Sequence, residues 1–153
     1  MAKEDSKTDI LSIAEGFLSN LGEELNADNM NKLNSQQLTL LAYYLFRREM
    51  LEGGMIQLIY NGYGPFIFEN PFAKCMRLWG LHDFSKLLYD GRRLYSQYRD
   101  AIMEANTDED FMALYEQHPE MDVIDDEFVE TEPSITEQLN EYVEQHLDAF
   151  IKA

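Results

Sequence analysis

Apolar residues recur at helical spacing along most of this chain. Between residues 8 and 21 one helical face carries Ile10, Ile13, Ala14, Phe17, Leu18 and Leu21. Gly22 is suited to end that helix, and residues 22–32 are predicted to form a polar loop. Asn34 and Gln37 then have the spacing of a helix N-cap and its capping box. The helix that they open is apolar on most sides around residues 38–46, which is typical of a central helix.

Helical spacing also governs the middle of the chain. It resumes after Gly53 and Gly54, over residues 55–59, and turn residues follow at 61–64. Asn70 before Pro71 predicts the N-cap and first position of a short helix over 72–81. A long helix is predicted from about residue 83 to 105, with Gly91 as an interruption.

The last third of the chain predicts two further helices. Thr107 and the acids after it form a favourable helix start, and that helix is expected to end near His118. Residues 120–133 have no clear period and are interpreted as an acidic connector. Ser134 and Glu137 have the spacing of a capping box, which predicts a final helix over residues 136–152.

These patterns together predict an all-α protein. Sustained alternation of apolar and polar residues, the signature of a half-buried strand, is not found in the sequence. We expect residues 1–153 to form a single compact helical domain of about six to seven helices, with residues 1–7 flexible. The predicted core consists of residues on the apolar helix faces: Leu41, Leu45, Ile56, Ile59, Trp79, Leu87 and Leu94.

Composition indicates the cellular compartment of the protein. A chain of 153 residues is long enough to bury a core without disulfides or metals, and its one cysteine, Cys75, cannot form an internal disulfide. The N-terminal ten residues have no apolar stretch of the kind that a signal peptide needs. Apolar runs are also too short to span a bilayer. These features predict a cytoplasmic protein.

Charge is distributed very unevenly along the chain. The net charge is −17, and residues 101–153 contain 16 acids but only one base, Lys152. Such a surface repels nucleic acids and anionic lipids and attracts cationic partners. The regular apolar residues within the same segment argue against a disordered acidic tail. A folded acidic surface is therefore expected, either as a binding surface for a cationic partner or as a solvated face that only aids solubility.

Catalytic and cofactor motifs are weak in this sequence. Gly62 and Gly64 make only a G-x-G, which lacks the strand, helix and basic residue of a phosphate-binding loop. His82, His118 and His146 are far apart in sequence and form no pattern of zinc ligands. Cys75 is interpreted as a small packing residue. We expect no catalytic residues, no metal site and no cofactor.

The glycine pair belongs to a longer motif that resembles a known family. Six residues carry the resemblance: Glu49, Gly53, Gly54, Gln57, Asn61 and Gly64. Their spacing is similar to E-x-N-N-G-G-F-x-Q-Y-F-x-N, the signature of a bacterial family of small acidic helical proteins named for a DNA-mimic protein and formerly a domain of unknown function. The chain departs from it at Leu51, Glu52, Met55, Leu58 and Ile59. The resemblance covers roughly residues 35–150.

The resemblance implies both a fold and a function. It implies a dimeric acidic protein that occupies the DNA-binding surface of a transcription factor. Because the motif is apolar and centred on glycine, we interpret it as a structural motif in which Glu49, Gln57 and Asn61 hold the glycine turn. If the protein mimics DNA, the surface that does so must lie outside this motif.

The candidate partner-binding residues are acids of the last third. In the predicted final helix Glu137, Glu141, Glu144 and Asp148 recur at helical spacing on one face. Further candidates are Asp108, Glu109, Asp110, Asp125, Asp126, Glu127 and Glu130. The expected partner is a basic, nucleic-acid-binding protein, with no direct binding of nucleic acid or membrane. An immunity or regulatory protein without DNA mimicry, and an enzyme with an unrecognised site, remain alternatives.

Overall fold

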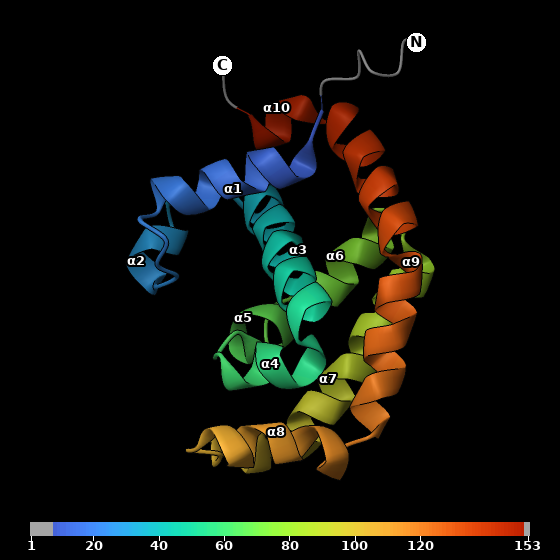
Figure 1. Cartoon of the computed structure of the whole chain (residues 1–153). Helices are drawn as coiled ribbons and strands as arrows, with labels where there is room; N and C mark the ends of the chain where they lie inside the picture. Colours follow the sequence, from blue (N-terminus) through green and yellow to red (C-terminus); the bar gives the residue numbers. More distant parts are fainter. Residues whose placement is uncertain (1–7, 152–153) are drawn as a thin grey trace. The chain divides into compact units, whose positions relative to one another are not determined.

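The computed structural model describes residues 8–151, so the predicted flexible segment 1–7 lies outside the described residues. The all-α prediction is confirmed: the described residues form 10 helices and no strand (Figure 1), and 7 of these helices have seven or more residues. Within the same residues no helix is both long enough and apolar enough to cross a membrane.

Contacts within the chain define two compact units, which are described separately below. The terminal unit combines Met1–Tyr44 with Pro133–Ala153, and the central unit is Leu45–Glu132. Helices α3 (Ser35–Glu52) and α9 (Glu120–Glu144) contribute residues to both units. The prediction of one domain over the whole chain stays a prediction.

The terminal unit contains α1 (Ile10–Asn20), α2 (Ala27–Met30), α10 (Leu147–Phe150) and parts of α3 and α9. Asp9 caps α1, because its carboxylate accepts a hydrogen bond from the Leu11 N–H at 3.1 Å. The capping box of α3 is present: the Gln37 N–H donates to Asn34 Oδ1 at 2.7 Å, and the Asn34 N–H donates to Gln37 Oε1 at 2.9 Å. The predicted loop 22–32 is wrong in part, since it contains α2.

Residues from distant parts of the sequence form the core of the terminal unit. Its buried side chains include Ile10, Ala14, Phe17, Leu40, Leu41, Tyr43, Leu139, Val143 and Phe150. The Ile10 N–H donates to Asn140 Oδ1 at 2.9 Å, which fixes the start of α1 against α9. The Tyr43 hydroxyl lies 2.8 Å from the Thr136 hydroxyl, which links α3 to α9 within the same unit.

The central unit adds α4 (Gly54–Tyr60), α5 (Gly64–Phe68), α6 (Phe72–Leu78), α7 (His82–Met103) and α8 (Asp108–Gln117). Gly91 does not interrupt α7, although an interruption was predicted there. A Cβ at this glycine would lie 3.3 Å from the Phe68 ring, so the missing side chain lets α5 pack closely on α7. Asn70 was predicted as the cap of α6, but its amide donates instead to the Phe66 carbonyl at 3.0 Å, at the end of α5.

Aromatic rings fill the core of the central unit. Phe46 contacts Phe72, Phe84 and Phe128 with ring centroids 6.2, 5.7 and 5.0 Å apart. These edge-on arrangements are the ones that ring quadrupoles favour. The predicted core residues in this unit are buried, except Trp79, which is only partly buried at the C-terminal end of α6.

Helix α9 corrects the prediction for the acidic connector. Residues 120–133 are helical and continue without a break into the predicted final helix, with Pro133 inside it. Met121, Ile124, Phe128, Ile135 and Leu139 are all buried, so a helical stripe runs through the segment. The prediction was wrong because apolar residues do recur at helical spacing within 120–133, and because it began the final helix at Ser134. Ser134 is consequently an interior residue of α9 and not an N-cap.

Candidate functional site

Three groups of acids are exposed on the last helices. The first is at the start of α8, where Asp108, Glu109 and Asp110 are all exposed in the first turn. Thr107 caps this turn, since its hydroxyl accepts a hydrogen bond from the Asp110 N–H at 3.0 Å. Acids are favourable here because the N-terminal end of a helix carries partial positive charge. This group therefore also stabilises α8, whatever it binds.

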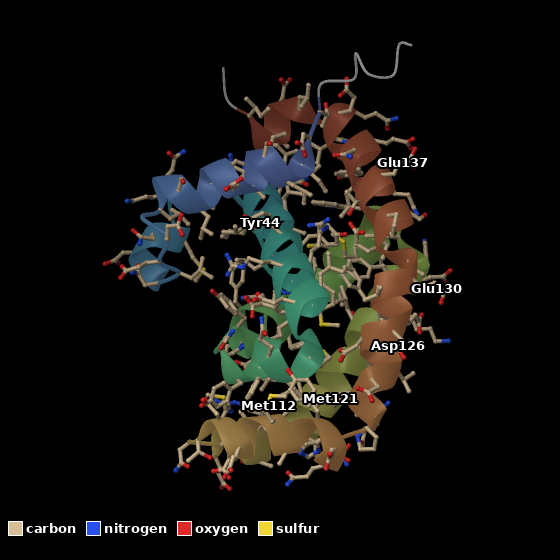
Figure 2. The ribbon with its side chains drawn as sticks, viewed as in Figure 1. Tyr44, Met112, Met121, Asp126, Glu130 and Glu137 are labelled. Carbon is tan, nitrogen blue, oxygen red and sulfur yellow. The ribbon has the colours of Figure 1, made fainter. Side chains whose placement is uncertain are left out.

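The second group lies on the part of α9 that belongs to the central unit. Asp122, Asp126 and Glu130 follow one another at steps of four residues, and all three are exposed. Side chains at this spacing share one helix face. Asp126 and Glu130 project from the outer side of the α9 ribbon in Figure 2. We call these three residues the central α9 acids. Glu127 is also exposed, one step around the helix.

The third group lies on the part of α9 that belongs to the terminal unit. Glu137, Glu141 and Glu144 are exposed at steps of four and three residues, and we call them the terminal α9 acids. The Thr8 hydroxyl donates to a Glu144 carboxylate oxygen, which ties the last of them to the segment before α1.

The predicted row on the final helix is shorter than expected. Helix α9 ends at Glu144, and the exposed Asp148 belongs to the separate helix α10. His146 occupies the break: its Nδ1 lies 2.7 Å from the Tyr142 carbonyl, and its ring stacks on the Tyr142 ring. The distance between the Glu144 and Asp148 carboxylates therefore cannot be derived from the rise of one continuous helix.

Asp125 differs from the other candidate acids because it faces inward. Its Oδ1 accepts a hydrogen bond from the Met55 N–H at 2.8 Å, near the start of α4. Burial raises the pKa of Asp125 to about 7, opposed by the hydrogen bond from Met55 and reinforced by the charges of Asp122 and Asp126. This carboxyl group joins α9 to the glycine turn, so it is not available to an external partner in this structure.

The glycine motif forms a polar network around a tight turn. Gly54 has a φ of +77°, and Tyr115 donates from its hydroxyl to the Gly53 carbonyl at 2.9 Å. The buried Glu49 carboxylate accepts hydrogen bonds from Gln57 Nε2 at 3.0 Å and Asn61 Nδ2 at 2.9 Å. The two amides thereby compensate for part of the desolvation of a buried acid.

The remaining glycines of the motif have different local roles. A Cβ at Gly53 would collide with the Gln57 side chain, and one at Gly64 would collide with the Tyr95 ring. Each glycine therefore marks a close approach of another group to the backbone. No anion-binding loop is needed to account for these glycines.

Among the described residues, the histidines and the cysteine do not converge on a site. His118 is buried and its ring lies 4.6 Å from the Tyr98 ring, whereas His82 and His146 are exposed in different units. Within residues 8–151, no three His, Cys, Asp or Glu residues are grouped as metal ligands would be. Cys75 is partly buried on α6.

One exposed acid of α9 escaped the sequence analysis. Asp122 is part of the central α9 acids, yet the segment containing it was interpreted as an aperiodic connector. The spacing of four residues to Asp126 and again to Glu130 was the available signal. Apolar Val123 and Val129 are also exposed on this part of α9, at 65% and 53% of their full areas.

Comparison with known proteins fits these features. Residues 31–146 match the DMP19-like protein family. The chain belongs to this family. It is 31% identical over 124 residues to the DNA mimic protein DMP19 of Neisseria meningitidis serogroup B (strain ATCC BAA-335 / MC58), an alignment that covers 80% of this chain and 75% of that relative. The matched region includes the glycine motif, α8 and all of α9, so this DMP19-like protein shares the segments that carry most of the exposed acids.

Proposed function

We propose that this DMP19-like protein is a non-enzymatic binding protein that occupies the nucleic-acid-binding surface of a basic partner. The observation that carries the proposal is the spacing of exposed carboxylates on each part of α9. The relative named DNA mimic protein supports it. A transcription factor is the partner class that we propose, and the cytoplasm is the compartment in which the two would meet.

The spacing of the carboxylates suits a surface that binds phosphate-recognising side chains. Successive acids on each part of α9 are three or four residues apart, which corresponds to about 4.5–6 Å along the helix axis. Phosphates follow one strand of DNA with an axial rise of about 3.4 Å and a longer distance between the charges themselves. Lysine and arginine side chains placed for phosphates can therefore reach carboxylates at this spacing.

Two matched charge variants test the proposal and locate its surface. One carries Asp122→Asn, Asp126→Asn and Glu130→Gln, and the other carries Glu137→Gln, Glu141→Gln and Glu144→Gln. Asp100→Asn, Glu104→Gln and Glu116→Gln form the control, because these exposed acids lie off α9 and their loss changes the net charge equally.

The measurement is competition on an isolated partner. A protein captured from the native lysate on the immobilised wild type is eluted with salt and purified, and it is then titrated with each variant and with labelled duplex DNA. We expect DNA and the wild-type protein to exclude one another. At least one α9 variant should lose most of its affinity. Its binding should also depend less on salt, because salt screens the charge–charge attraction that the variant no longer makes, over about 8 Å at physiological ionic strength. The control should bind as the wild type does.

Val123 and Val129 favour a second candidate, a regulatory protein that binds its partner without mimicking DNA. Exposed apolar residues next to charged ones are a common composition of protein interfaces. In that case both α9 variants would retain most of the affinity and Val123→Ser would lose it. Simultaneous binding of DNA and the DMP19-like protein to the partner would exclude mimicry.

A further inference from the structure

Lysines and arginines of this acidic protein are concentrated on two helices of the central unit. Helices α6 and α7 carry six of the 12 bases of the chain but only three of its 29 acids, and all six bases are exposed. Five of them lie between residues 74 and 93, and we call them the α6–α7 cations: Lys74, Arg77, Lys86, Arg92 and Arg93. Their charge is opposite to the net charge of −17.

The α6–α7 cations are not paired with acids of the part of the chain that the structure describes. Elsewhere in the central unit, Arg47 pairs with Glu132 at 2.7 Å and Arg48 with Glu49 at 3.4 Å. None of the five α6–α7 cations forms an ion pair with any residue from 8 to 151, although acids outnumber bases by 29 to 12. Their charges are therefore available to a group from outside the chain.

On α7 the cations surround an exposed tyrosine. Lys86 lies three residues before Tyr89, Arg92 lies three after it and Arg93 four after it, so these side chains share one helix face. The Tyr89 side chain is 43% exposed. Asp90 directly follows Tyr89 and is only partly exposed, and it lies about 100° further around the helix. The face centred on Tyr89 therefore combines an aromatic ring with positive charge.

A small depression where α6 meets α7 adds Lys74 to this face. Lys74, Tyr89 and Arg92 all line it, and its other lining residues are uncharged. The Ser85 hydroxyl holds the two helices together here, because it donates to the Ala73 carbonyl at 2.8 Å. The depression has a volume of about 30 Å³, whereas a single water needs about 10–15 Å³. One carboxylate group therefore fits, but a drug-sized molecule does not.

The extent of the surface favours a short acidic peptide over a nucleic acid. Lys86 and Arg93 are separated by seven residues, which is about 10 Å along α7. A nucleic acid carries charges far beyond such a length and would meet the field of a molecule with a net charge of −17. A peptide with a few carboxylates can stay within the surface. Its apolar residues can contact Tyr89 and also Leu78, which is 72% exposed at the end of α6.

We infer that the α6–α7 cations, together with Tyr89 and Leu78, bind a short acidic segment of a protein partner that also carries apolar residues. One carboxylate would occupy the depression lined by Lys74 and Arg92, where a guanidinium group can donate two parallel hydrogen bonds. Clusters of arginine are a recurring means of recognising acidic motifs. The inference is independent of the proposed function, because the α9 acids attract groups of the opposite charge.

The double variant Lys74→Gln, Arg92→Gln tests the inference at the depression. Both side chains are exposed and unpaired within residues 8–151, so the substitutions should leave the fold intact, which circular dichroism and urea unfolding check. The control Lys32→Gln, Arg99→Gln changes the net charge equally. Lys32 belongs to the terminal unit, and Arg99 lies seven residues, or about 10 Å along α7, beyond Arg92.

The probe is a fluorescently labelled synthetic peptide of about 10 residues, rich in glutamate and aspartate with interspersed leucines. Binding to the full chain is measured by fluorescence anisotropy in about 0.15 M salt, where charges act over about 8 Å, so nearby cations outweigh the net charge of the whole chain. We expect the wild type and the control to bind the peptide alike. Lys74→Gln, Arg92→Gln should bind about three- to tenfold more weakly, as expected for the loss of two exposed ion pairs.

A second double variant, Lys86→Gln, Arg93→Gln, tests the surface outside the depression. Loss of affinity in at least one double variant, with the control unchanged, supports the inference. An equal loss in the control, equal affinity of the wild type and both double variants, or a dissociation constant above about 1 mM for the wild type would overturn it.

Two further ligands test the chemistry of the segment. A peptide in which glutamine and asparagine replace the acids should bind far more weakly, and equal binding would show that charge is not what the surface recognises. A single-stranded oligonucleotide with the same number of charges should also bind more weakly than the acidic peptide. If it binds more tightly and loses affinity in the same double variants, the surface recognises nucleic acid and the inference is wrong.

Discussion

Gly54 is the residue whose identity the structure constrains most directly. Its φ of +77° lies in the left-handed region, and a Cβ there would overlap the Asp125 carboxylate, with Asp125 Cγ only 2.6 Å away. Gly62 has a similar φ of +89° but has no atom within 4 Å of a built Cβ. Comparing substitutions at the two glycines therefore distinguishes the cost of torsional strain from the cost of steric overlap.

We expect Gly62→Ala to cost about 1–2 kcal/mol of unfolding free energy, from the left-handed torsion alone. Gly54→Ala should cost about 1–3 kcal/mol more, because Asp125 and the start of α4 must also move. Urea unfolding monitored by circular dichroism measures both. If the two variants were equally stable, the contact between Gly54 and Asp125 would not contribute to the stability of the fold.

Asp125 makes the stability of the protein depend on pH. Burial raises the pKa of Asp125 to about 7 in the folded state, from an ordinary value of 3.8. Between these pH values the folded state binds more protons at this site than the unfolded state does, so the contribution to stability falls as pH rises. Asp125→Asn removes this titration and keeps an oxygen for the Met55 N–H.

The expected result is a flatter stability profile for Asp125→Asn between pH 4 and pH 7, measured by urea unfolding across that range. Its gain over the wild type should be largest at pH 8. Glu130→Gln is the control for the loss of one negative charge on the same helix, since Glu130 is exposed and its charge is not among those that raise the pKa of Asp125. An unchanged slope in Asp125→Asn would show that the carboxyl group titrates normally in the folded protein.

At the scale of the elements, the prediction concerns the residues at which helices begin. Thr107 caps α8 in the structure, whereas Ser134 was predicted to cap a helix and lies inside α9. We expect Thr107→Ala to cost about 0.5–2 kcal/mol of unfolding free energy, since the Asp110 N–H loses its acceptor. Ser134→Ala should change stability by less than about 0.5 kcal/mol, as expected at an exposed position away from a cap.

Chemical denaturation of the two single variants measures the difference. A cost for Ser134→Ala as large as that for Thr107→Ala would mean that a helix begins at Ser134 in solution and that α9 is interrupted at Pro133. Because proline in a helix interior removes a hydrogen bond and crowds the preceding turn, this is the position where such a break would occur.

At the scale of the whole molecule, a net charge of −17 opposes folding through repulsion among the acids. We expect the wild type to become more stable as salt rises from about 0.01 to 0.3 M, because the Debye length shortens from about 30 Å to below 8 Å. The variant Glu137→Gln, Glu141→Gln, Glu144→Gln should show a weaker salt dependence and greater stability at low salt.

Thermal unfolding over the salt series checks this expectation. Gly16→Ala is the uncharged control: it should raise stability by about 0.5–1 kcal/mol at every salt concentration and leave the salt dependence unchanged. If neutralising the terminal α9 acids lowered stability, these acids would contribute to the fold and their binding role would need another explanation.

Local sequence patterns predicted most helices, because amphipathic spacing and caps act over a few residues. Asn34 with Gln37, Thr107 and the apolar face of α1 all predicted what the structure contains. The motif from Glu49 to Gly64 also indicated the family, through residue types and spacing alone. The resemblance conveyed no arrangement of charges, so the functional surface had to be inferred separately.

Tertiary structure alone decided which acids face outward. Asp125 and Asp126 are adjacent and chemically identical, yet one accepts a hydrogen bond from Met55 and the other is exposed. Packing of Ile124, Phe128 and Ile135 keeps α9 helical through Pro133, which overrides the local preference of proline. Packing also brings residues between 12 and 37 together with Phe150 and Ile151 around one groove of the terminal unit. Contacts between segments so far apart depend on the packed core, and neither helical period nor residue type encodes them locally.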